Sequence, residues 1–443
     1  MKTRTLSTVC LFVLLLLQSV ACAGPEVTAH PFPSQTHVYN TGTPTLAVPS
    51  LTPSRLPSTP TAEARSLAPF RYVDSVADLV ADPYGRVDLY APVDGSVWFI
   101  PLDPYGGDKF VTRWEVTDRQ RVIPVDEEMS ITVDDAGRAW VLRLGGTDIE
   151  IWEQGEWTTQ GVDQGWIADS GFAEFWWAPK VRQVITDASG GSWVATQNDL
   201  RYFDGQRWTI HSGEEMGFSE PEWGEISVHY RIAISPEGDR LWVGECHYCP
   251  LGPAGGGGVR WFEGGMWRGG DSSIGSKCVS ILTVDRSGDV WIGEEDAIWR
   301  YQPANGKWTS FPLLEASQFG FNFNHPLDLL VDQDGDIWVI VQFCGGANCD
   351  TESYLYRIHA GEGSVAAEPS DWWEPRKDLL SGADGRSWLL WEGVFYQIID
   401  GELLPLVTIE PRGIALDPFG NVWVLDGNEG AAALWVLDTT LVE

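Results

Sequence analysis

The chain has 443 residues, of which 43% are hydrophobic, and this apolar content excludes a wholly disordered protein. It carries 29 basic and 63 acidic residues, a formal net charge of −34, so it should repel nucleic-acid backbones and anionic membrane surfaces. We therefore expect no nucleic-acid partner, whereas cations, neutral polar ligands and basic proteins stay open. The 48 glycines and 27 prolines favour many turns over long helices.

Residues 1–22 have the pattern of an export signal. A positively charged start precedes an apolar stretch, residues 8–20, that is long enough for a signal peptide and short for a bilayer span. The sequence SVAC at 19–22 resembles a bacterial lipobox, which predicts a lipid on Cys22; ordinary cleavage after Ala23 is the alternative. Lipid chains would hold the protein on the outer face of the bacterial cytoplasmic membrane or at the cell surface, and without them it would be secreted.

Residues 23–68 are rich in proline, serine and threonine and show no apolar periodicity, which predicts a disordered tether. Residues 69–443 are expected to form one folded domain. No second apolar stretch of spanning length occurs after the leader, so we expect the lipid to be the sole attachment to the membrane.

One pattern recurs eight times within 69–443: an alternating apolar strand, a turn with Asp and Gly, and a strand containing Trp. Clear examples are VSILTVDRSGDVWIG (279–293) and LDLLVDQDGDIWVI (327–340). Most of these tryptophans lie about 40 to 50 residues apart, which is the period of a propeller blade. They are Trp98, Trp140, Trp193, Trp242, Trp291, Trp338, Trp388 and Trp423.

A second hairpin follows in several units, as in LRYFDGQRWTI at 200–210, so each unit is expected to form four strands, A to D from the axis outward. The sequence therefore predicts an all-β fold, a single β-propeller of eight four-stranded blades. Seven blades are the alternative, if the first or last unit is degenerate. The last unit ends after its third strand, and residues 70–75 are expected to supply the fourth, which would close the ring.

Two segments, GGSWVATQNDLRYFDGQRWTIHS (190–212) and GDVWIGEEDAIWRYQPANGKWTSF (288–311), resemble the two-component-regulator propeller repeat. Propellers of that family usually form the extracytoplasmic sensing part of bacterial signalling receptors. The resemblance implies a non-catalytic ligand-binding or sensor propeller on the cell envelope. No kinase-like segment follows the repeats, so any signal is expected to pass to a separate chain. A passive envelope scaffold that binds another protein is an alternative.

Aromatic residues outside the repeat pattern precede several A strands, and carboxylates follow B strands. Because the D-to-A and B-to-C loops open on the same face, these side chains are expected to line one face of the propeller. There they could stack on and hydrogen-bond a glycan-like or cationic ligand. The candidates are Trp176, Trp177, Trp223, His325, Trp372, Trp373, Glu294 and Glu295.

Five cysteines follow Cys22, and an exported protein favours disulfides. The loop CGGANC predicts a Cys344–Cys349 pair. Cys278 is expected to pair with Cys249 or with Cys246 and so to join two units. A zinc site is the alternative. Its ligands would be Cys246, His247, Cys249 and Cys278.

The segment WVGECH at 242–247 resembles streptogramin lyases, which are single-chain propellers. In that family a Glu-x-His pair after a B-strand Trp works with another His and a magnesium ion. The resemblance implies an alternative function, an elimination enzyme that moves protons with Glu245, His247 and His229. No serine-nucleophile elbow, phosphate loop or HExxH signature occurs, so we favour a protein without catalytic activity or cofactor.

Overall fold

The structure is a computed structural model of the chain. It describes residues 70–437, and the predicted leader (1–22), lipid site (Cys22) and tether (23–68) lie outside the described residues. The segments within 70–437 that are not described are 77–86, 102–109, 116–118, 125–128, 144–147, 167–182, 197–198, 219–226, 250–251, 270–277, 295–296, 314–322, 345–351, 372–377, 383–384, 410 and 429–430.

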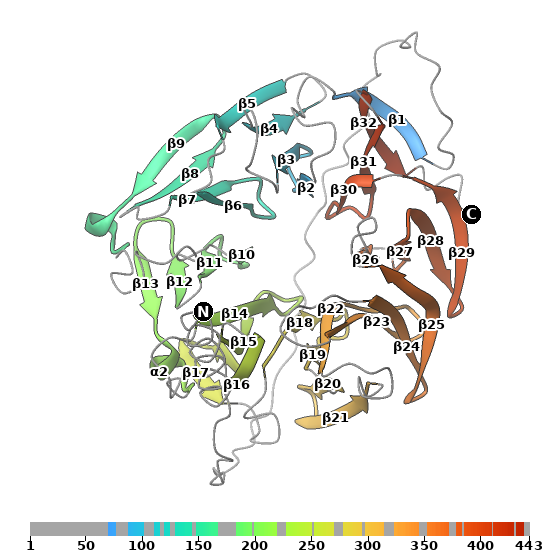
Figure 1. Ribbon diagram of the computed structural model, residues 1–443. Helices are drawn as coiled ribbons and strands as arrows, with labels where there is room; N and C mark the ends of the chain where they lie inside the picture. The colour runs from blue at the N-terminus through green and yellow to red at the C-terminus, as the bar shows by residue number, and fades with distance from the viewer. Residues whose placement is uncertain are drawn as a thin grey trace, which may run out of the picture.

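The described strands form eight four-stranded antiparallel sheets arranged in a ring, so the predicted eight-bladed β-propeller is confirmed (Figure 1). The first strand of each blade lies nearest the centre. Blades 1 to 4 are β2 (Val87–Tyr90), β3 (Val97–Pro101), β4 (Phe110–Trp114) and β5 (Arg119–Pro124); β6 (Met129–Val133), β7 (Ala139–Arg143), β8 (Ile149–Glu153) and β9 (Glu156–Gln160); β10 (Gln183–Thr186), β11 (Ser192–Ala195), β12 (Leu200–Phe203) and β13 (Trp208–His211); and β14 (Ser227–Ile234), β15 (Arg240–Cys249), β16 (Gly252–Glu263) and β17 (Met266–Gly269). Blades 5 to 8 are β18 (Ile281–Val284), β19 (Val290–Gly293), β20 (Ala297–Gln302) and β21 (Lys307–Pro312); β22 (Phe323–Val331), β23 (Ile337–Cys344), β24 (Glu352–His359) and β25 (Glu362–Asp371); β26 (Asp378–Ser381), β27 (Ser387–Trp391), β28 (Val394–Ile399) and β29 (Glu402–Thr408); and β30 (Pro411–Leu416), β31 (Val422–Asn428), β32 (Ala431–Leu437) and β1 (Phe70–Ser75).

The ring is closed by strands from both ends of the domain. Strand β1 pairs antiparallel with β32, with Phe70 opposite Leu437 and Tyr72 opposite Trp435. The first strand of the domain is thus the outermost strand of blade 8, as the sequence predicts, and the seven-blade alternative is wrong. Closure by β hydrogen bonds joins the first blade to the last without a further element.

Helix is scarce in the described part of the chain. It comprises the 3₁₀ turn η1 (Val162–Gln164) and the α-helix α2 (Gly213–Met216), which follows blade 3. The Ser212 side chain caps α2 by accepting a hydrogen bond from the backbone N–H of Glu215. No helix in these described segments is long and apolar enough to cross a bilayer.

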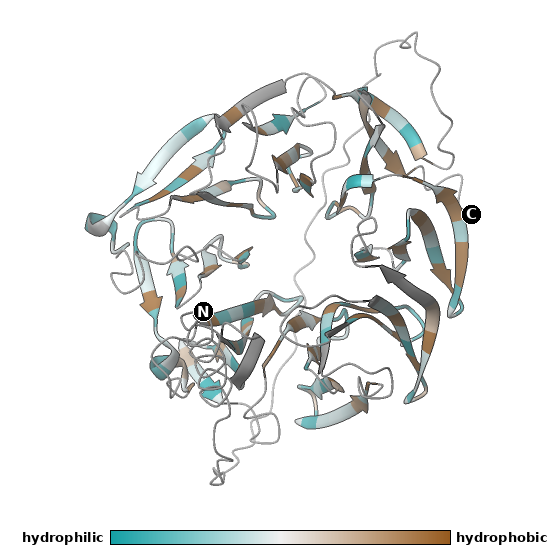
Figure 2. Ribbon diagram, in the orientation of Figure 1, coloured by the Kyte–Doolittle hydropathy of each residue, from teal (hydrophilic) through white to brown (hydrophobic). Residues whose placement is uncertain are grey.

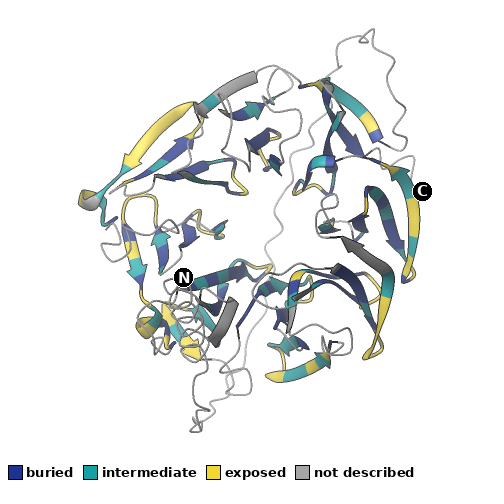
Figure 3. Ribbon diagram, viewed as in Figure 1, coloured by how far each residue is buried: buried dark blue, intermediate teal, exposed yellow. Residues whose placement is uncertain are grey.

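The apolar core lies between neighbouring blades. Figures 2 and 3 show hydrophobic, buried residues along the inner strands and exposed residues on outer strands such as β9 and β29. In one seam, Trp98 and Val111 of blade 1 cluster with Val133 and Val141 of blade 2. A blade cannot bury both its faces alone, so each sheet is stabilised by its neighbours.

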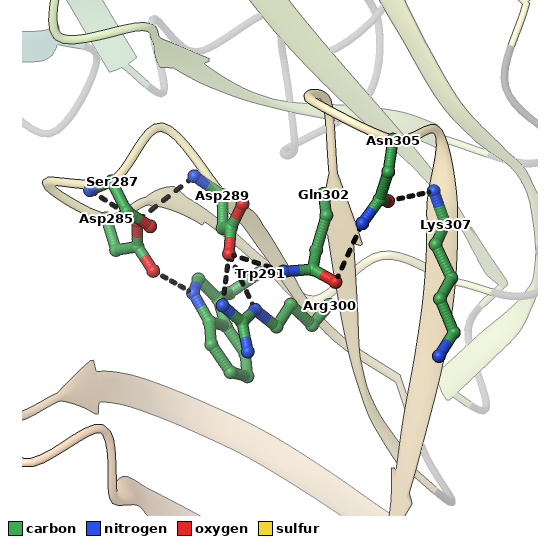
Figure 4. Close-up of polar contacts among 8 residues, drawn as sticks. All are labelled: Asp285, Ser287, Asp289, Trp291, Arg300, Gln302, Asn305 and Lys307. Atoms are coloured by element: carbon green, nitrogen blue, oxygen red, sulfur yellow. Dashed lines mark hydrogen bonds and ion pairs between the residues drawn. The ribbon is translucent and has the colours of Figure 1, made fainter.

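A carboxylate in the A-to-B turn holds the buried tryptophan of the B strand. In blade 5, Asp285 Oδ1 accepts hydrogen bonds from the backbone N–H groups of Ser287 (2.8 Å) and Asp289 (3.0 Å), while Oδ2 accepts one from Trp291 Nε1 at 2.7 Å (Figure 4). The guanidinium of Arg300 lies over the Trp291 ring, 5.3 Å from its centroid, and is ion-paired with Asp289. One aspartate therefore fixes the turn and satisfies an indole that would otherwise be buried without an acceptor.

The same arrangement recurs in three further blades and explains the repeated D-x-x-G-x-x-W pattern. The distances from the indole Nε1 to the carboxylate Oδ2 are 3.0 Å for Trp140 and Asp134, 2.9 Å for Trp338 and Asp332, and 3.0 Å for Trp423 and Asp417.

Replacing Asp332 by Ala should lower the free energy of unfolding by about 3 kcal/mol, because it removes the turn bonds and leaves the Trp338 indole buried without an acceptor. Urea denaturation measures the change. The control is Asp334→Ala in the same turn, where the side chain is exposed and the expected loss is under about 0.5 kcal/mol. Equal losses in both variants would contradict this role of Asp332.

Candidate functional site

Most of the predicted ligand-face residues lie outside the described part of the chain, so the aromatic face stays a prediction. These residues are Trp176, Trp177, Trp223, Glu295, Trp372 and Trp373. The Cys344–Cys349 pair also stays a prediction, because Cys349 and the Cys344 side chain lie outside the described residues. Of the predicted ligand-face residues, Glu294 and His325 are described.

Glu294 belongs to the interior of blade 5 and not to a ligand-facing surface. It is fully buried, and its Oε2 accepts a hydrogen bond of 2.8 Å from Trp299 Nε1. The expectation that this carboxylate faces a ligand is therefore corrected, because the side chain is buried and accepts the hydrogen bond of the Trp299 indole.

His325 lies on β22, the innermost strand of blade 6, and is partly buried. Burial, and then the positive charge of Arg231 on the innermost strand of blade 4, lower the pKa of His325 below its ordinary value. Arg231 is held by a hydrogen bond from its Nε to the carbonyl of Ser280, at 3.1 Å. The imidazole of His325 and the guanidinium of Arg231 thus both belong to innermost strands, β22 and β14, and interact electrostatically.

Glu245 and His247, the pair suggested by the lyase resemblance, do lie together. Glu245 Oε2 is 3.1 Å from His247 Nε2, and Tyr230 donates a long hydrogen bond of 3.4 Å to Glu245 Oε1. Glu245 is 1% exposed, and burial followed by the Glu245 charge raises the pKa of Tyr230. A Cβ on Gly257 would lie 2.2 Å from Glu245 Oε2, so this position must be glycine for the carboxylate to fit.

His229 does not join this pair. In the β14–β15 register Tyr230 lies opposite Glu245, whereas His229 lies opposite Cys246. Successive side chains of a strand point to opposite faces of the sheet, so His229 points away from Glu245 and His247. The three groups proposed for proton transfer are therefore not assembled. The donors do not fit a magnesium ion either, since the described residues contain no group of three or more His, Cys, Asp or Glu side chains able to hold a metal.

Cys246 forms a disulfide with Cys278, and this bond joins β15 of blade 4 to the segment that leads into blade 5. Of the two pairings left open for Cys278, the structure contains this one, so the Cys249–Cys278 alternative is not formed. The zinc alternative is also corrected, because two of its four sulfur and nitrogen ligands are bonded to each other and cannot bind a metal as thiolates.

A cavity of about 280 Å³ lies between blades 3 and 4, at the end of the ring formed by the A-to-B and C-to-D turns. This is the opposite end from the loops that the sequence singles out. Trp193 is one of its lining residues, with ring centroids 4.5 Å from Tyr202, 5.3 Å from Phe262 and 5.5 Å from His211. Trp193 belongs to the repeat pattern, and nothing in the sequence singles out the other three rings, so the sequence carries no signal for this cavity.

Two carboxylates complete the lining, Asp187 from the turn of blade 3 and Asp239 from the turn of blade 4. Asp187 Oδ1 accepts backbone hydrogen bonds from Ser189 (2.8 Å) and Gly191 (3.0 Å). In contrast to blades 2, 5, 6 and 8, no hydrogen bond joins this aspartate to the B-strand indole among the described residues. Trp193 and Asp187 thus both line the cavity without this bond between them.

The Asp187 carboxylate also lies close to a phenol in the same cavity. Burial is the main cause that raises the pKa of Tyr202, and the charge of Asp187 adds to it. The Tyr202 hydroxyl lies 3.4 Å from Ser189 Oγ. The cavity therefore combines aromatic faces with negative charge, and the phenol stays protonated at neutral pH.

No protein-family model matches the sequence, and no curated protein matches it. Solved structures similar to the chain include a streptogramin B lyase (16% identity over 70% of this chain and 93% of that chain, TM-score 0.41) and virginiamycin B lyase from Staphylococcus aureus (14%, 83% and 98%, TM-score 0.41). Another is the extracellular domain of a B. thetaiotaomicron protein described as a hybrid two-component system (10%, 84% and 59%, TM-score 0.34). At these identities the similarity concerns the propeller fold and not the activity.

Replacing Cys246 by Ser should lower the free energy of unfolding by about 3 kcal/mol, because the disulfide closes a loop between residues 32 apart. Denaturant unfolding, with peptide mapping under non-reducing conditions, measures both stability and pairing. Cys249→Ser is the matched control and should leave the Cys246–Cys278 peptide intact. A Cys249–Cys278 peptide in the unmodified protein would contradict the assignment.

The lowered pKa of His325 makes stability depend on pH. Below the unfolded-state pKa of about 6.5 the unfolded chain binds a proton that the native state resists, so the free energy of unfolding falls as the pH falls towards the native pKa. Arg231→Gln removes one cause and should raise the pKa of His325 in an NMR titration. Arg268→Gln, a half-exposed site on blade 4, is the control. An unshifted His325 in the unmodified protein would refute this account.

Proposed function

We propose that this chain is an exported, non-catalytic binding propeller that captures a small organic cation in the cavity between blades 3 and 4. The observation that carries the proposal is the lining of this cavity, where the aromatic rings of Trp193, Tyr202 and Phe262 lie beside the carboxylates of Asp187 and Asp239. Aromatic faces attract cations through their quadrupole, and neighbouring carboxylates supply the counter-charge.

The charge of the whole chain supports a cationic ligand. A formal net charge of −34 raises the local concentration of cations around the protein. A volume of about 280 Å³ suits a compact head group, such as a quaternary ammonium, better than an oligosaccharide. The cationic class is thus favoured over the glycan-like class that the sequence left open.

A lyase function is not supported by the Glu245–His247 pair. Glu245 is 1% exposed, so it does not reach a substrate in solution, and its two oxygens face His247 and Tyr230. His229 lies on the other face of the sheet, beyond the reach of this pair. A general base has to contact the proton that it removes, and this carboxylate is enclosed.

We further propose that the protein is displayed on the cell envelope. The leader pattern of residues 1–22 supports export, and the lipobox-like sequence ending at Cys22 supports a lipid anchor. The Cys246–Cys278 disulfide is in keeping with an oxidising compartment. The tether, residues 23–68, would hold the propeller away from the membrane, where a separate signalling chain or another envelope protein could respond to the bound state.

The test is a calorimetric titration of the protein with tetramethylammonium. Asp187→Asn keeps a side-chain oxygen for the turn but removes the charge, and Tyr202→Leu removes one aromatic face. Each should weaken binding by about tenfold, which corresponds to about 1.4 kcal/mol. Asp400→Asn, in the exposed C-to-D turn of blade 7, is the matched control and should bind normally. An absence of binding by the unmodified protein, or equal affinity in all variants, would refute the proposal.

A further inference from the structure

A histidine is among the residues that line the cavity between blades 3 and 4. His211, the last residue of β13, is 6% exposed. Its ring stacks on Trp193 with an interplanar angle of 29°, and its centroid lies 5.8 Å from that of Phe262. The imidazole is therefore part of the aromatic lining, and a charge on it would lie in the same cavity.

One nitrogen of this imidazole faces two partners that require opposite protonation states. Trp267 Nε1, on β17 of blade 4, lies 3.3 Å from His211 Nδ1, and an indole N–H can only donate, so it requires a lone pair there. Glu215 Oε1, on α2, lies 2.9 Å from the same nitrogen, and a carboxylate can only accept, so it requires a proton there. A neutral imidazole suits Trp267, whereas an imidazolium suits Glu215.

The surroundings of His211 accommodate both states. The Glu215 side chain is about half-exposed, so it can turn towards solvent when the imidazole is neutral. Trp267 is only partly buried, so water can accept its N–H when the imidazole is charged. Proton uptake thus exchanges one partner for another, and histidine is the side chain whose charge ordinarily changes between about pH 5 and pH 8.

The other titratable groups of the cavity are acidic or neutral. Asp187 and Asp239 line it from the turns of blades 3 and 4, and neither forms an ion pair within the described segments. The phenol of Tyr202, on β12, stays neutral because burial and then the nearby Asp187 raise its pKa. A cation in this cavity therefore meets uncompensated carboxylates as long as His211 is neutral.

The arginines of the neighbouring strands are directed elsewhere. Arg260 of β16 is hydrogen-bonded to the backbone carbonyl of the residue that ends α2. Arg201 of β12 lies over the Trp166 ring, in the seam with blade 2. Arg268 of β17 is ion-paired with Glu263. The lining itself contains no lysine or arginine, so the imidazole is the lining group that can supply a positive charge.

We infer that the cavity exchanges its cation for a proton on His211, so that the ligand is held at neutral or higher pH and released as the pH falls. This inference rests on the proposed function of the cavity. A proton on His211 places a positive charge within the site, where like charges repel more strongly than in water. Because coupling between two bound species is reciprocal, a bound cation also hinders proton uptake.

The experiment is a calorimetric titration with tetramethylammonium, which has no titratable proton, at about pH 8 and about pH 5. The affinity of the unmodified protein should be at least about tenfold lower at the lower pH. His211→Asn keeps a polar group at Nδ1 without a charge, so its affinity should change by less than about twofold. His359→Gln is the matched control, since His359 also pairs with a carboxylate but on blade 6, and it should keep the tenfold change.

Glu215→Gln tests the exchange without altering a buried side chain, so the test stands even if His211→Asn does not fold. The substitution removes the carboxylate that favours the imidazolium. The pH at which half of the affinity is lost should therefore be lower than in the unmodified protein. An unchanged midpoint would contradict the role given to Glu215 and His211.

Two patterns separate the failure of this inference from the failure of the proposed function. Tetramethylammonium binding that is equally tight at both pH values, or that weakens equally in His211→Asn, would overturn the proton exchange and leave the cation site standing. An absence of binding at both pH values would overturn the cation site itself, and the proton exchange with it.

Discussion

The propeller depends on one recurring hydrogen bond: in blades 2, 5, 6 and 8 a turn carboxylate accepts the buried indole N–H of the B strand. In blade 2 the carboxylate of Asp134 binds the turn backbone with one oxygen and Trp140 with the other. The Trp140 ring then packs against Trp208 of blade 3, with ring centroids 6.0 Å apart. A local turn bond thus orients the side chain that fills the seam between two blades, which is why turn and core residues recur together in the sequence.

Two turns without this bond border cavities, although the turns of blades 5 and 6, which have it, line the larger of these cavities as well. In blade 3 the indole of Trp193 is not bonded to Asp187, and both residues border the smaller cavity. In blade 7 Gly382 stands in the place of the aspartate and borders a cavity of about 740 Å³ between blades 5, 6 and 7. Proteins commonly depart from their own structural rules at functional sites. Here the repeat supplies an internal reference against which each departure can be recognised.

The fold was predictable from the sequence because its signals are local and repeated. The alternation of apolar residues and the D-x-x-G-x-x-W turn occur in most units, and the last unit visibly lacks a fourth strand, which residues 70–75 supply. The site was less predictable. Trp193, Tyr202 and Phe262 are repeat residues, and only their three-dimensional arrangement distinguishes a lined cavity from ordinary packing. The side chain of His229 could be assigned to a face only once its partner, Cys246, was known.

The residues that resemble a catalytic pair are better explained as a clamp between blades. Alternation along β15 directs Glu245 and His247 towards blade 3 and Cys246 towards blade 5. On one side, Glu245 contacts Tyr230, whose hydroxyl would lie 2.9 Å from a Cβ on Gly213 in α2. On the other side, the disulfide and the bond from the Val279 N–H to the Glu245 carbonyl hold blade 5. Three consecutive residues thus attach blade 4 to both neighbouring blades. The carboxylate of Glu245 is buried in this contact, so it does not reach a substrate in the way that the lyase-like sequence suggests.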